Sequence, residues 1–230
     1  MTTLGRSFVP RRLGIMPDGN RRWAAKNGLT AVDGYREGAV RLLQFCSWCD
    51  DLGIESVTAW LATERNILQR PHHELTGLYD VIAELARSVA GQRRYRLAVI
   101  GDLRMVPADL RATLAEAVEA TASAPGMELV LGVACGGRMQ IVRAVEGCLA
   151  ERPGEPVTEQ AVAAWLARHH HGELDLMIRA SGESRISDMG LWEAAWAELH
   201  FSAPLWEDFT RADLDHAVKE FASRRRRFGY

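Results

Sequence analysis

The sequence lacks the features that would place this protein in a membrane or on a nucleic acid. No apolar run approaches the roughly 18 residues that cross a bilayer, and the first residues carry no hydrophobic signal-peptide core. Neither sign of charge dominates, because 28 Lys and Arg stand against 30 Asp and Glu. A net charge near zero gives no general attraction to nucleic acid or to an anionic membrane. We therefore expect a cytoplasmic protein with no nucleic-acid partner and no stable membrane anchor.

Cysteine is also scarce, with four residues in a chain of 230. Cys46 and Cys49 are spaced like a metal-binding pair, but they lie inside a helical run, and no second pair stands near Cys135 or Cys148. This pattern argues against a cysteine-based metal site. It favours reduced thiols in the core of a cytoplasmic protein.

What the sequence does contain is an alternation of apolar, strand-length runs with amphipathic helical segments. Strands are predicted at 13–17, 56–61, 96–100, 128–135, 174–180 and 199–202. Helices are predicted at 23–27, 36–52, 72–90, 107–122, 139–150, 159–170, 191–198 and 211–223. Because the strands lack strict polar alternation and are interleaved with helices, we expect an α/β fold with a central, mostly parallel sheet flanked by helices. The length suits a single domain over residues 1–230, with residues 1–12 expected to be flexible.

The most informative segment lies near the start, where an apolar strand is followed by PDGNRRW at residues 17–23. Asp18 can hold a hard divalent cation. The backbone N–H groups after Gly19, at a helix N-terminus, can bind phosphate oxygens, and Arg21 and Arg22 can grip them with forked donors. The alternative is an Asp-Gly turn beside solvated arginines. The position of Asp18 at the carboxyl end of a strand, where open α/β sheets bind ligands, favours a site for phosphate and metal.

A second candidate anion site is the segment DLMIRASGESRIS at residues 175–187. A buried strand would deliver Arg179 at its carboxyl end, and the following turn presents Arg185 and Ser187. Two arginines and a hydroxyl suit a diphosphate. The alternative is a loop that only caps the strand, with Arg179 paired to a neighbouring carboxylate. Further on, Glu198 precedes a strand and is either a second metal ligand or the partner of an arginine.

Residues between these two sites add an apolar wall and another cation. Trp60 lies near the carboxyl end of a strand, and Arg70 stands just before a helix. Two phosphate sites, one or two metal ligands and an aromatic-rich apolar interior describe a substrate with a diphosphate head and an apolar tail. The basic run at 224–227 is either a solvated helix end or a further contribution to a phosphate site.

With these residues in place, the chain resembles the cis-prenyltransferases, the undecaprenyl diphosphate synthase family. The resemblance runs from Leu13 to Gly229. It rests on motifs in the family's order: PDGNRRW (17–23), the TE…RP element (63–71), CGGR (135–138), DLMIRASGESRIS (175–187), LWEAAWAELHF (191–201), LWEDF (205–209) and RRRRFG (224–229). It implies a homodimer with a central parallel sheet beside an elongated hydrophobic cleft, and small isoprenoid diphosphates as substrates.

The resemblance also implies roles for individual residues. Asp18 would be the catalytic carboxylate linked to Mg²⁺, with Asn20 as a second catalytic residue, and Glu198 would complete the metal site. The residues that would contact the allylic diphosphate are Gly19, Asn20, Arg21, Arg22 and Arg70, and Trp23 joins the substrate-binding set. Isopentenyl diphosphate would be bound by Arg179, Arg185 and Ser187. The arginines at 224–227, with Gly229, would reach the isopentenyl site of a partner subunit.

Several positions depart from the long-chain members of the family. Gly34-Tyr35 replaces the usual Gly-His, and the loop 29–33 lacks an arginine that normally contacts the allylic diphosphate. The segment 64–70 replaces a Glu-Asn-Trp element and is longer. Other changes fall at Ser184, Asp188 and Glu193. Because these changes gather around the allylic and catalytic region, they bear on the allylic partner more than on the fold.

Trp60 is the residue that bears most directly on product size. In the resemblance it stands where long-chain members carry a small residue on the tunnel wall. Because a close-packed wall cannot yield the space of an indole, we expect a short product of roughly ten to fifteen carbons. The alternative is that Trp60 faces the other side of the sheet.

Three functions fit these residues. The first is prenyl transfer from an allylic diphosphate to isopentenyl diphosphate, giving a short Z-prenyl diphosphate. The second is head-to-middle condensation of two dimethylallyl diphosphates, as in lavandulyl-type synthases. Tyr35, the run 26–35 and a blocked tunnel favour it, whereas Asn20 and an intact 185–187 element argue against it. The third is a non-catalytic partner subunit, which the retained Asp-Gly-Asn and Arg-x-Ser elements disfavour.

Overall fold

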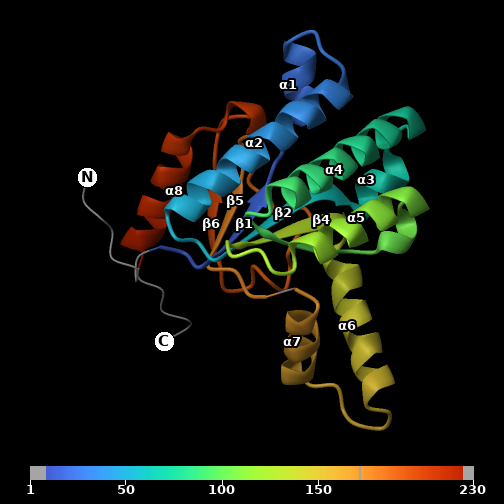
Figure 1. Ribbon diagram of the computed structural model, residues 1–230. Helices are drawn as coiled ribbons and strands as arrows, with labels where there is room; N and C mark the ends of the chain where they lie inside the picture. Colours follow the sequence, from blue (N-terminus) through green and yellow to red (C-terminus); the bar gives the residue numbers. More distant parts are fainter. Residues whose placement is uncertain (1–8, 171, 225–230) are drawn as a thin grey trace.

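A computed structural model describes residues 9–170 and 172–224 of the chain (Figure 1). Its centre is a sheet of six parallel strands in the order β3-β4-β2-β1-β5-β6. The strands are β1 (Arg12–Met16), β2 (Ser56–Thr63), β3 (Arg96–Ile100), β4 (Glu128–Cys135), β5 (Leu176–Arg179) and β6 (Glu198–Phe201). The predicted α/β fold with a parallel sheet is confirmed.

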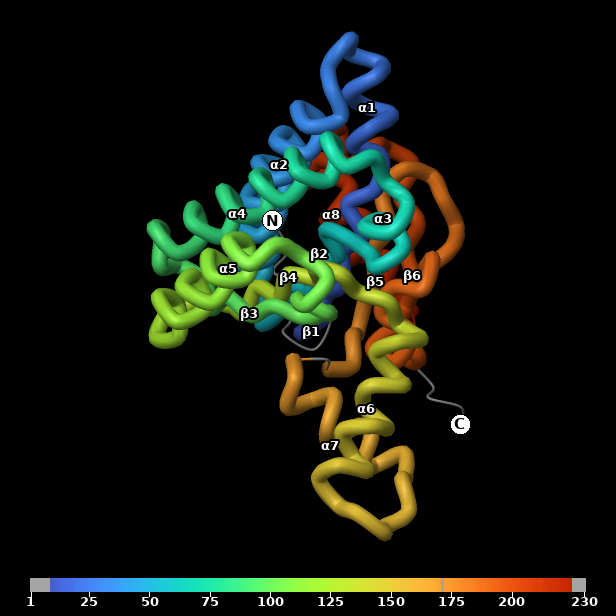
Figure 2. Tube along the Cα trace, turned by 90° about the vertical axis from the view of Figure 1, so that its right-hand side faces the viewer, coloured from blue at the N-terminus to red at the C-terminus, as the bar shows by residue number. Residues whose placement is uncertain are grey.

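Helices connect and cover these strands. They are α1 (Asn20–Lys26), α2 (Ala31–Asp51), α3 (Glu64–Gln69), α4 (His72–Gln92), α5 (Ala108–Thr121), α6 (Gly137–Glu151), α7 (Glu159–Arg168) and α8 (Arg211–Ser223), with short 3₁₀ turns η2 (Leu103–Met105) and η3 (Trp206–Asp208). Figures 1 and 2 show α2 and α4 side by side over one face of the sheet, whereas α6 and α7 extend together away from it. Among the described helices, none is long and apolar enough to span a membrane.

The two faces of the sheet bury different sets of side chains. Val57 and Ala59 of β2 join a large core cluster with apolar residues of α2, α4, α5 and α8. Trp60 instead joins a smaller cluster with Met16 and Met177, and the segment 186–199 packs against this cluster. Because successive side chains of a strand point to opposite faces, Ala59 and Trp60 lie in separate environments.

The described residues also bear on the predictions for the cysteines and the two ends of the chain. The cysteines are buried and free, at Cys46, Cys49, Cys135 and Cys148. Of the segment 1–12, which was expected to be flexible, residues 1–8 lie outside the described residues. Arg12 already belongs to β1, and the N–H groups of Arg11 and Arg12 donate to the Asp175 carboxylate. Most of the basic run at 224–227, and Gly229, also lie outside the described residues.

The helix predicted at 191–198 is wrong. Residues 191–196 form turns, and strand β6 begins at Glu198. The Glu193 carbonyl accepts the N–H of Leu174 at 2.7 Å, just before β5, which ties the segment to the sheet. A tertiary contact therefore overrides a pattern that is locally typical of a helix.

Conversely, α3 is a helix that the sequence did not predict. Its first turn is closed by a reciprocal pair of hydrogen bonds: Thr63 Oγ1 accepts from Asn66 N at 3.1 Å, and Asn66 Oδ1 accepts from Thr63 N at 3.3 Å. This capping box satisfies N–H groups that would otherwise be unpaired at the start of a helix. It places Arg70 at the end of α3, directly before Pro71 and α4.

Candidate active site

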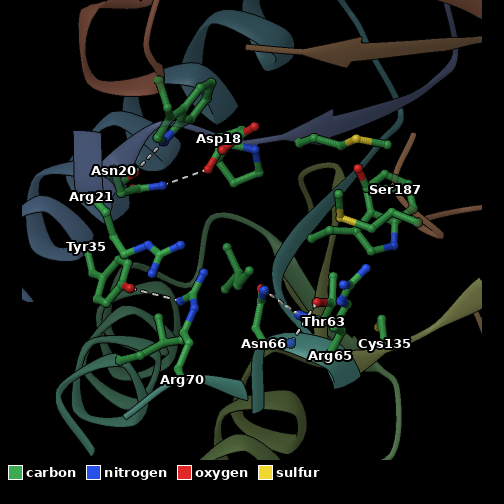
Figure 3. Close-up of a pocket in the computed structure, with 18 of the residues that line it drawn as sticks. Asp18, Asn20, Arg21, Tyr35, Thr63, Arg65, Asn66, Arg70, Cys135 and Ser187 are labelled. Carbon is green, nitrogen blue, oxygen red and sulfur yellow. Dashed lines mark hydrogen bonds between the residues drawn. The ribbon is translucent and has the colours of Figure 1, made fainter. Parts of the chain in front are cut away.

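A cavity of about 1080 Å³ opens at the edge of the sheet where the strands end. Its walls come from the carboxyl ends of β1, β2, β4 and β5 and from residues of α1, α2, α3 and α4. This is the edge at which open α/β sheets bind ligands. The sequence-predicted residues that line it are Asp18, Gly19, Asn20, Arg21, Arg22, Trp60, Arg70, Arg179, Arg185 and Ser187. Figure 3 labels five of them, namely Asp18, Asn20, Arg21, Arg70 and Ser187.

Asp18 follows β1 and contacts three polar side chains. Its Oδ2 accepts hydrogen bonds from Arg179 Nη2 at 2.7 Å and from Ser181 Oγ at 2.9 Å, and its Oδ1 lies 3.5 Å from Arg22 Nη2. Burial raises the pKa of this carboxyl, but the hydrogen bonds from Arg179 and Ser181 and the charges of the arginines outweigh burial, so the pKa lies below its ordinary value. Asp18 is therefore an anion at neutral pH.

The turn after Asp18 is held by close backbone contacts. Gly19 has a φ of 117°, and a Cβ there would lie 2.8 Å from Leu205 Cδ2, so both conformation and space require glycine. Asn20 begins α1, and its Nδ2 donates to the Pro17 carbonyl at 2.7 Å. On the other side, the N–H of Trp206 in η3 donates to the Asp18 carbonyl at 3.1 Å. The turn that carries Asp18 is therefore held between α1 and η3.

Arg179, at the end of β5, is 5% exposed and links two parts of the site. Its Nη2 donates to Asp18, while its Nη1 donates to Ser187 Oγ at 2.8 Å and to the Arg185 carbonyl. The sequence left open whether Arg179 serves an anion site or pairs with a carboxylate. It pairs with a carboxylate that itself belongs to the site, and so it fixes the loop of Arg185 and Ser187 beside Asp18.

Glu183 provides the acidic neighbour of two further arginines. Its Oε1 lies 3.4 Å from Arg22 Nη1, and its other oxygen forms an ion pair with Arg185. Because Arg22 also lies near Asp18, the two carboxylates and two arginines form a continuous charged surface along this side of the cavity.

A second charged group lies on the α2–α4 side. The Tyr35 hydroxyl donates to Glu74 Oε1 and accepts a hydrogen bond from Arg70 Nη1 at 2.9 Å, as Figure 3 shows for the Arg70 pair. Arg70 Nε and Arg21 Nη1 lie 3.5 and 3.8 Å from Glu74 Oε1. Burial and the hydrogen bond to Glu74 raise the pKa of the Tyr35 phenol far above its ordinary value. Tyr35 is therefore a protonated donor at any pH at which the protein is handled.

The cavity also has an apolar arm between α2 and α4. Its lining residues are Ala39 of α2, Leu61 of β2, and Leu78, Val81, Ile82 and Leu85 of α4. A wall of this kind suits a hydrocarbon chain, whereas the arginine-rich end suits a diphosphate.

Trp60 borders the cavity, but its indole lies on the face of the sheet away from α2 and α4. A Cβ at Gly14 or at Gly190 would stand 2.8 Å from the indole ring, which packs in the cluster beneath the segment 186–199. This placement favours the second of the two interpretations of Trp60, in which it faces the other side of the sheet. The apolar arm between α2 and α4 is lined by the residues named above, and the Trp60 indole does not lie between these helices.

Two predicted residues do not reach the cavity within one chain. Trp23 donates from Nε1 to Asp208 Oδ1 at 3.0 Å and is a link between α1 and η3. Glu198 begins β6 opposite Leu176, at the amino edge of the parallel sheet, whereas Asp18 follows the carboxyl edge. Its carboxylate binds Arg224 at 2.6 Å, which is the second of the alternatives left open for it. Within a single chain, Glu198 therefore does not complete a metal site with Asp18.

Three residues to which the sequence assigned no role complete the polar end: Ser181, Glu183 and Glu74. Glu74 follows Arg70 by four residues, which is the spacing of a helical ion pair. Ser181 comes directly after the strand that carries Arg179, and Glu183 lies in the same loop as Arg185. Their proximity to arginines in the sequence was the available signal.

Asp18 is the side chain best suited to a metal ion. Among the described residues there is no group of three or more His, Cys, Asp or Glu side chains that would form a metal cage by itself. Asp18 is an ionised, partly exposed oxygen ligand at the polar end. Mg²⁺ commonly binds one or two carboxylates and completes its shell with substrate phosphates and water. The residues present therefore fit a magnesium ion that binds together with a diphosphate.

Comparison with known proteins agrees with this geometry. The family model described as "Putative undecaprenyl diphosphate synthase" matches residues 15–229. "Isoprenyl transferase 2" of Streptomyces coelicolor is 37% identical, over 96% of this chain and 90% of that protein. The "(2Z,6E)-farnesyl diphosphate synthase" of Thermobifida fusca is 35% identical over the same shares of the two chains, 96% and 90%.

Solved structures show the same fold. The lavandulyl diphosphate synthase from Lavandula x intermedia, in complex with dimethylallyl diphosphate, superposes with a TM-score of 0.90 at 29% identity and covers 97% of this chain and 100% of that one. A probable undecaprenyl diphosphate synthase from Campylobacter jejuni gives a TM-score of 0.81 at 23% identity, with 96% and 99% covered.

Proposed function

Because this chain belongs to the undecaprenyl diphosphate synthase family of prenyl transferases, we propose that it condenses an allylic diphosphate with isopentenyl diphosphate to a Z-prenyl diphosphate of roughly ten to fifteen carbons. The observation that carries the proposal is the division of one cavity into an arginine-rich end around Asp18 and an apolar arm between α2 and α4. Relatives named as short-chain Z-isoprenyl and (2Z,6E)-farnesyl diphosphate synthases support the short product.

The two substrates would meet at Asp18. The allylic diphosphate would lie against Arg21, Arg22 and Arg70, with its tail in the α2–α4 arm. Isopentenyl diphosphate would lie against Arg179, Arg185 and Ser187. Arg22 and Arg179 contact Asp18 from these two sides, which supports a common meeting point.

The chemistry proposed here relies on stabilising a departing diphosphate. Mg²⁺, when bound with that group, would neutralise part of its charge. Arg22 and Arg70 would take up the negative charge that develops as the allylic C–O bond breaks. The double bond of isopentenyl diphosphate would then attack the allylic carbon to form the new C–C bond, and the adjacent carbon would lose a proton to a diphosphate oxygen in the cavity. The apolar side chains of the arm would keep water from the allylic carbon while it is cationic.

The direct test is product analysis. Purified protein with Mg²⁺ is incubated with dimethylallyl, geranyl or farnesyl diphosphate, each with and without isopentenyl diphosphate, and the dephosphorylated products are identified. We expect a short Z-prenol that requires isopentenyl diphosphate. Failure of every allylic diphosphate to give a product would indicate the binding subunit instead.

A second candidate is head-to-middle condensation of two dimethylallyl diphosphates. The similarity to lavandulyl diphosphate synthase over the whole chain is the observation that favours it. The same experiment separates the two reactions, because a branched product from dimethylallyl diphosphate alone would identify the second.

We also propose that the protein works in the cytoplasm as a homodimer. Its sheet ends in β6, and large apolar side chains are exposed on that edge and on α6, at Met139, Val142, Leu149, Trp196 and Phe201. Exposed apolar residues of this kind suit an interface. A contribution of Glu198 to the metal site would require a second copy of the chain. Light scattering coupled to size-exclusion chromatography should give a mass of about twice the 25.5 kDa of one chain.

A further inference from the structure

Tyr35 and Glu74 are buried beside the half-buried Arg70, and the reaction proposed above uses Arg70 but gives no role to the other two. Tyr35 lies on α2 and is 6% exposed, and Glu74 lies in the first turn of α4 and is 8% exposed. Arg70 ends α3, so three elements contribute one side chain each. Tyr35 and Arg70 line the cavity, whereas Glu74 lies behind them.

The hydroxyl of Tyr35 connects the other two side chains. A phenol has one hydrogen to donate and lone pairs that accept. The hydrogen goes to Glu74, so a lone pair is directed to Arg70 Nη1 at 2.9 Å. The Arg70 Cζ also lies 5.3 Å from the centre of the Tyr35 ring. The hydrogen bond and the contact with the ring therefore both hold the long, flexible side chain of Arg70 against Tyr35.

The group stands at the boundary between the two ends of the cavity. On α2, Tyr35 is four residues before Ala39, and on α4, Glu74 is four residues before Leu78. Residues four apart on a helix lie on the same face, about one turn along. Ala39 and Leu78 belong to the apolar arm, so the charged group lies one turn from its start. In an allylic diphosphate, this is where the first isoprene unit joins the diphosphate.

We propose that Tyr35, anchored by Glu74, is a positioning residue that fixes the Arg70 guanidinium for the diphosphate of the allylic substrate. The inference rests on the proposed function, because it requires an allylic diphosphate in the cavity. It assigns to Tyr35 and Glu74 a role that concerns one substrate and leaves the isopentenyl side, around Arg179, untouched.

The first test is Tyr35→Phe, with Tyr95→Phe as the control. Tyr95 is another buried tyrosine, but it lies outside the cavity. Loss of the hydroxyl should raise the KM of the allylic diphosphate about tenfold, as expected for one hydrogen bond to a charged group, and leave the KM of isopentenyl diphosphate within about twofold. An equal rise of both KM values, or no rise of either, overturns the proposal.

A double-mutant cycle tests whether Tyr35 acts through Arg70. In an Arg70→Gln background, Tyr35→Phe should have little further effect on the allylic KM, because the group that it positions is gone. Independent effects that multiply would show a role for the hydroxyl that does not involve Arg70, and so contradict the proposal.

Binding measurements keep this test separate from the proposed reaction. Calorimetric titration with dimethylallyl diphosphate requires no turnover. If the wild-type protein makes no product but binds dimethylallyl diphosphate, and Tyr35→Phe weakens that binding about tenfold, the proposed reaction fails and the positioning role stands. If the wild-type protein turns over substrate and the variant binds dimethylallyl diphosphate unchanged, the reaction stands and the positioning role fails.

Discussion

Asp18 shows how one residue is fixed by its backbone while its side chain stays available for chemistry. Its carbonyl accepts the N–H of Trp206, and the next residue, Gly19, is packed against Leu205. Its carboxylate, by contrast, has as hydrogen-bond and ionic partners among the described residues the side chains of Arg22, Arg179 and Ser181, which face the cavity or its rim. A substitution that keeps the shape of this side chain should therefore change charge without moving the turn.

Asp18→Asn is expected to lower kcat/KM about a thousandfold, because the amide cannot supply the negative charge that a metal ion and the transition state require. Far-ultraviolet circular dichroism should be unchanged. The control is Asp80→Asn, an exposed position on α4, with activity near that of the wild-type protein. Retention of more than about a tenth of the activity by Asp18→Asn would remove this residue from the mechanism.

Trp60→Ala separates the two interpretations of that residue. Because the indole is 4% exposed and packs among Met16, Met177 and the segment 186–199, its loss should cost about 3 to 5 kcal/mol in the free energy of unfolding, measured in urea. Product length should stay the same, because the α2–α4 arm has other walls. Longer products from this variant would show that Trp60 does limit the length of the prenyl product.

For single residues, the sequence predicted which charged side chains line the site better than it predicted which side chains pair with them. Asp18, Arg179 and Ser187 could be located because Asp18 and Ser187 come after predicted strands and Arg179 lies near the carboxyl end of one. Glu74 could not be assigned in the same way, since its role depends on Tyr35 of another helix, 39 residues away. Side-chain pairs across elements depend on helix packing angles, which the hydrophobic pattern does not specify.

The elements that hold the site are short. The segment Leu205–Asp208 contacts the turn after Asp18 through Leu205 and the Trp206 N–H, and the Trp206 indole donates to the Gly38 carbonyl of α2 at 2.8 Å. Asp208 accepts from Trp23 of α1. One 3₁₀ turn, η3, therefore joins α1, α2 and the Asp18 turn.

Trp23→Phe removes the hydrogen bond between α1 and η3 and nothing that touches the cavity. Because α1 carries Arg21 and Arg22, we expect the KM of the allylic diphosphate to rise about two- to fivefold, with the KM of isopentenyl diphosphate unchanged. Steady-state kinetics with each substrate varied in turn measures both values. Trp165→Phe on α7 is the matched control, and an equal effect of the two variants would contradict a role for this link.

Secondary structure was predictable where the apolar period continued without interruption, as in β4 and α4. It was not predictable where hydrogen bonds to other elements decided the conformation. The segment 191–196 forms turns, and its Glu193 carbonyl accepts a hydrogen bond from the Leu174 N–H. Helix α3 depends on the reciprocal capping hydrogen bonds between Thr63 and Asn66. Both errors lie next to the cavity, where the chain departs from regular packing.

At the scale of the whole molecule, the buried carboxyl of Glu207 couples the free energy of unfolding to pH. Glu207 in η3 is 3% exposed, and neither of its carboxyl oxygens has a hydrogen-bond partner within the described part of the chain. Burial raises its pKa to about 7, and the nearby Asp208 and Glu37 add to the shift. Since an unfolded glutamate titrates near 4.5, the folded protein keeps this proton over a pH range in which the unfolded chain has lost it.

Stability should therefore fall as the pH rises from about 5 to about 7, by up to about 3 kcal/mol from this group. Glu207→Gln keeps the shape and removes the ionisation, so its urea midpoint should be higher than that of the wild-type protein at about pH 8 and similar at about pH 5. Glu84→Gln, at an exposed position of α4, should follow the wild-type curve. Parallel curves for Glu207→Gln and the wild-type protein would show that Glu207 does not titrate in this range.

The acidic neighbours of the cavity arginines have a consequence for ligand entry. Five of the arginines that line the cavity stand beside a carboxylate of the chain: Arg21 and Arg70 beside Glu74, Arg22 and Arg185 beside Glu183, and Arg179 beside Asp18. An incoming diphosphate therefore competes with anions that the protein already supplies, and binding exchanges one set of ionic partners for another. Such an exchange releases few counterions to the solvent. The affinity for a diphosphate should then depend on ionic strength much less steeply than the number of arginines would suggest.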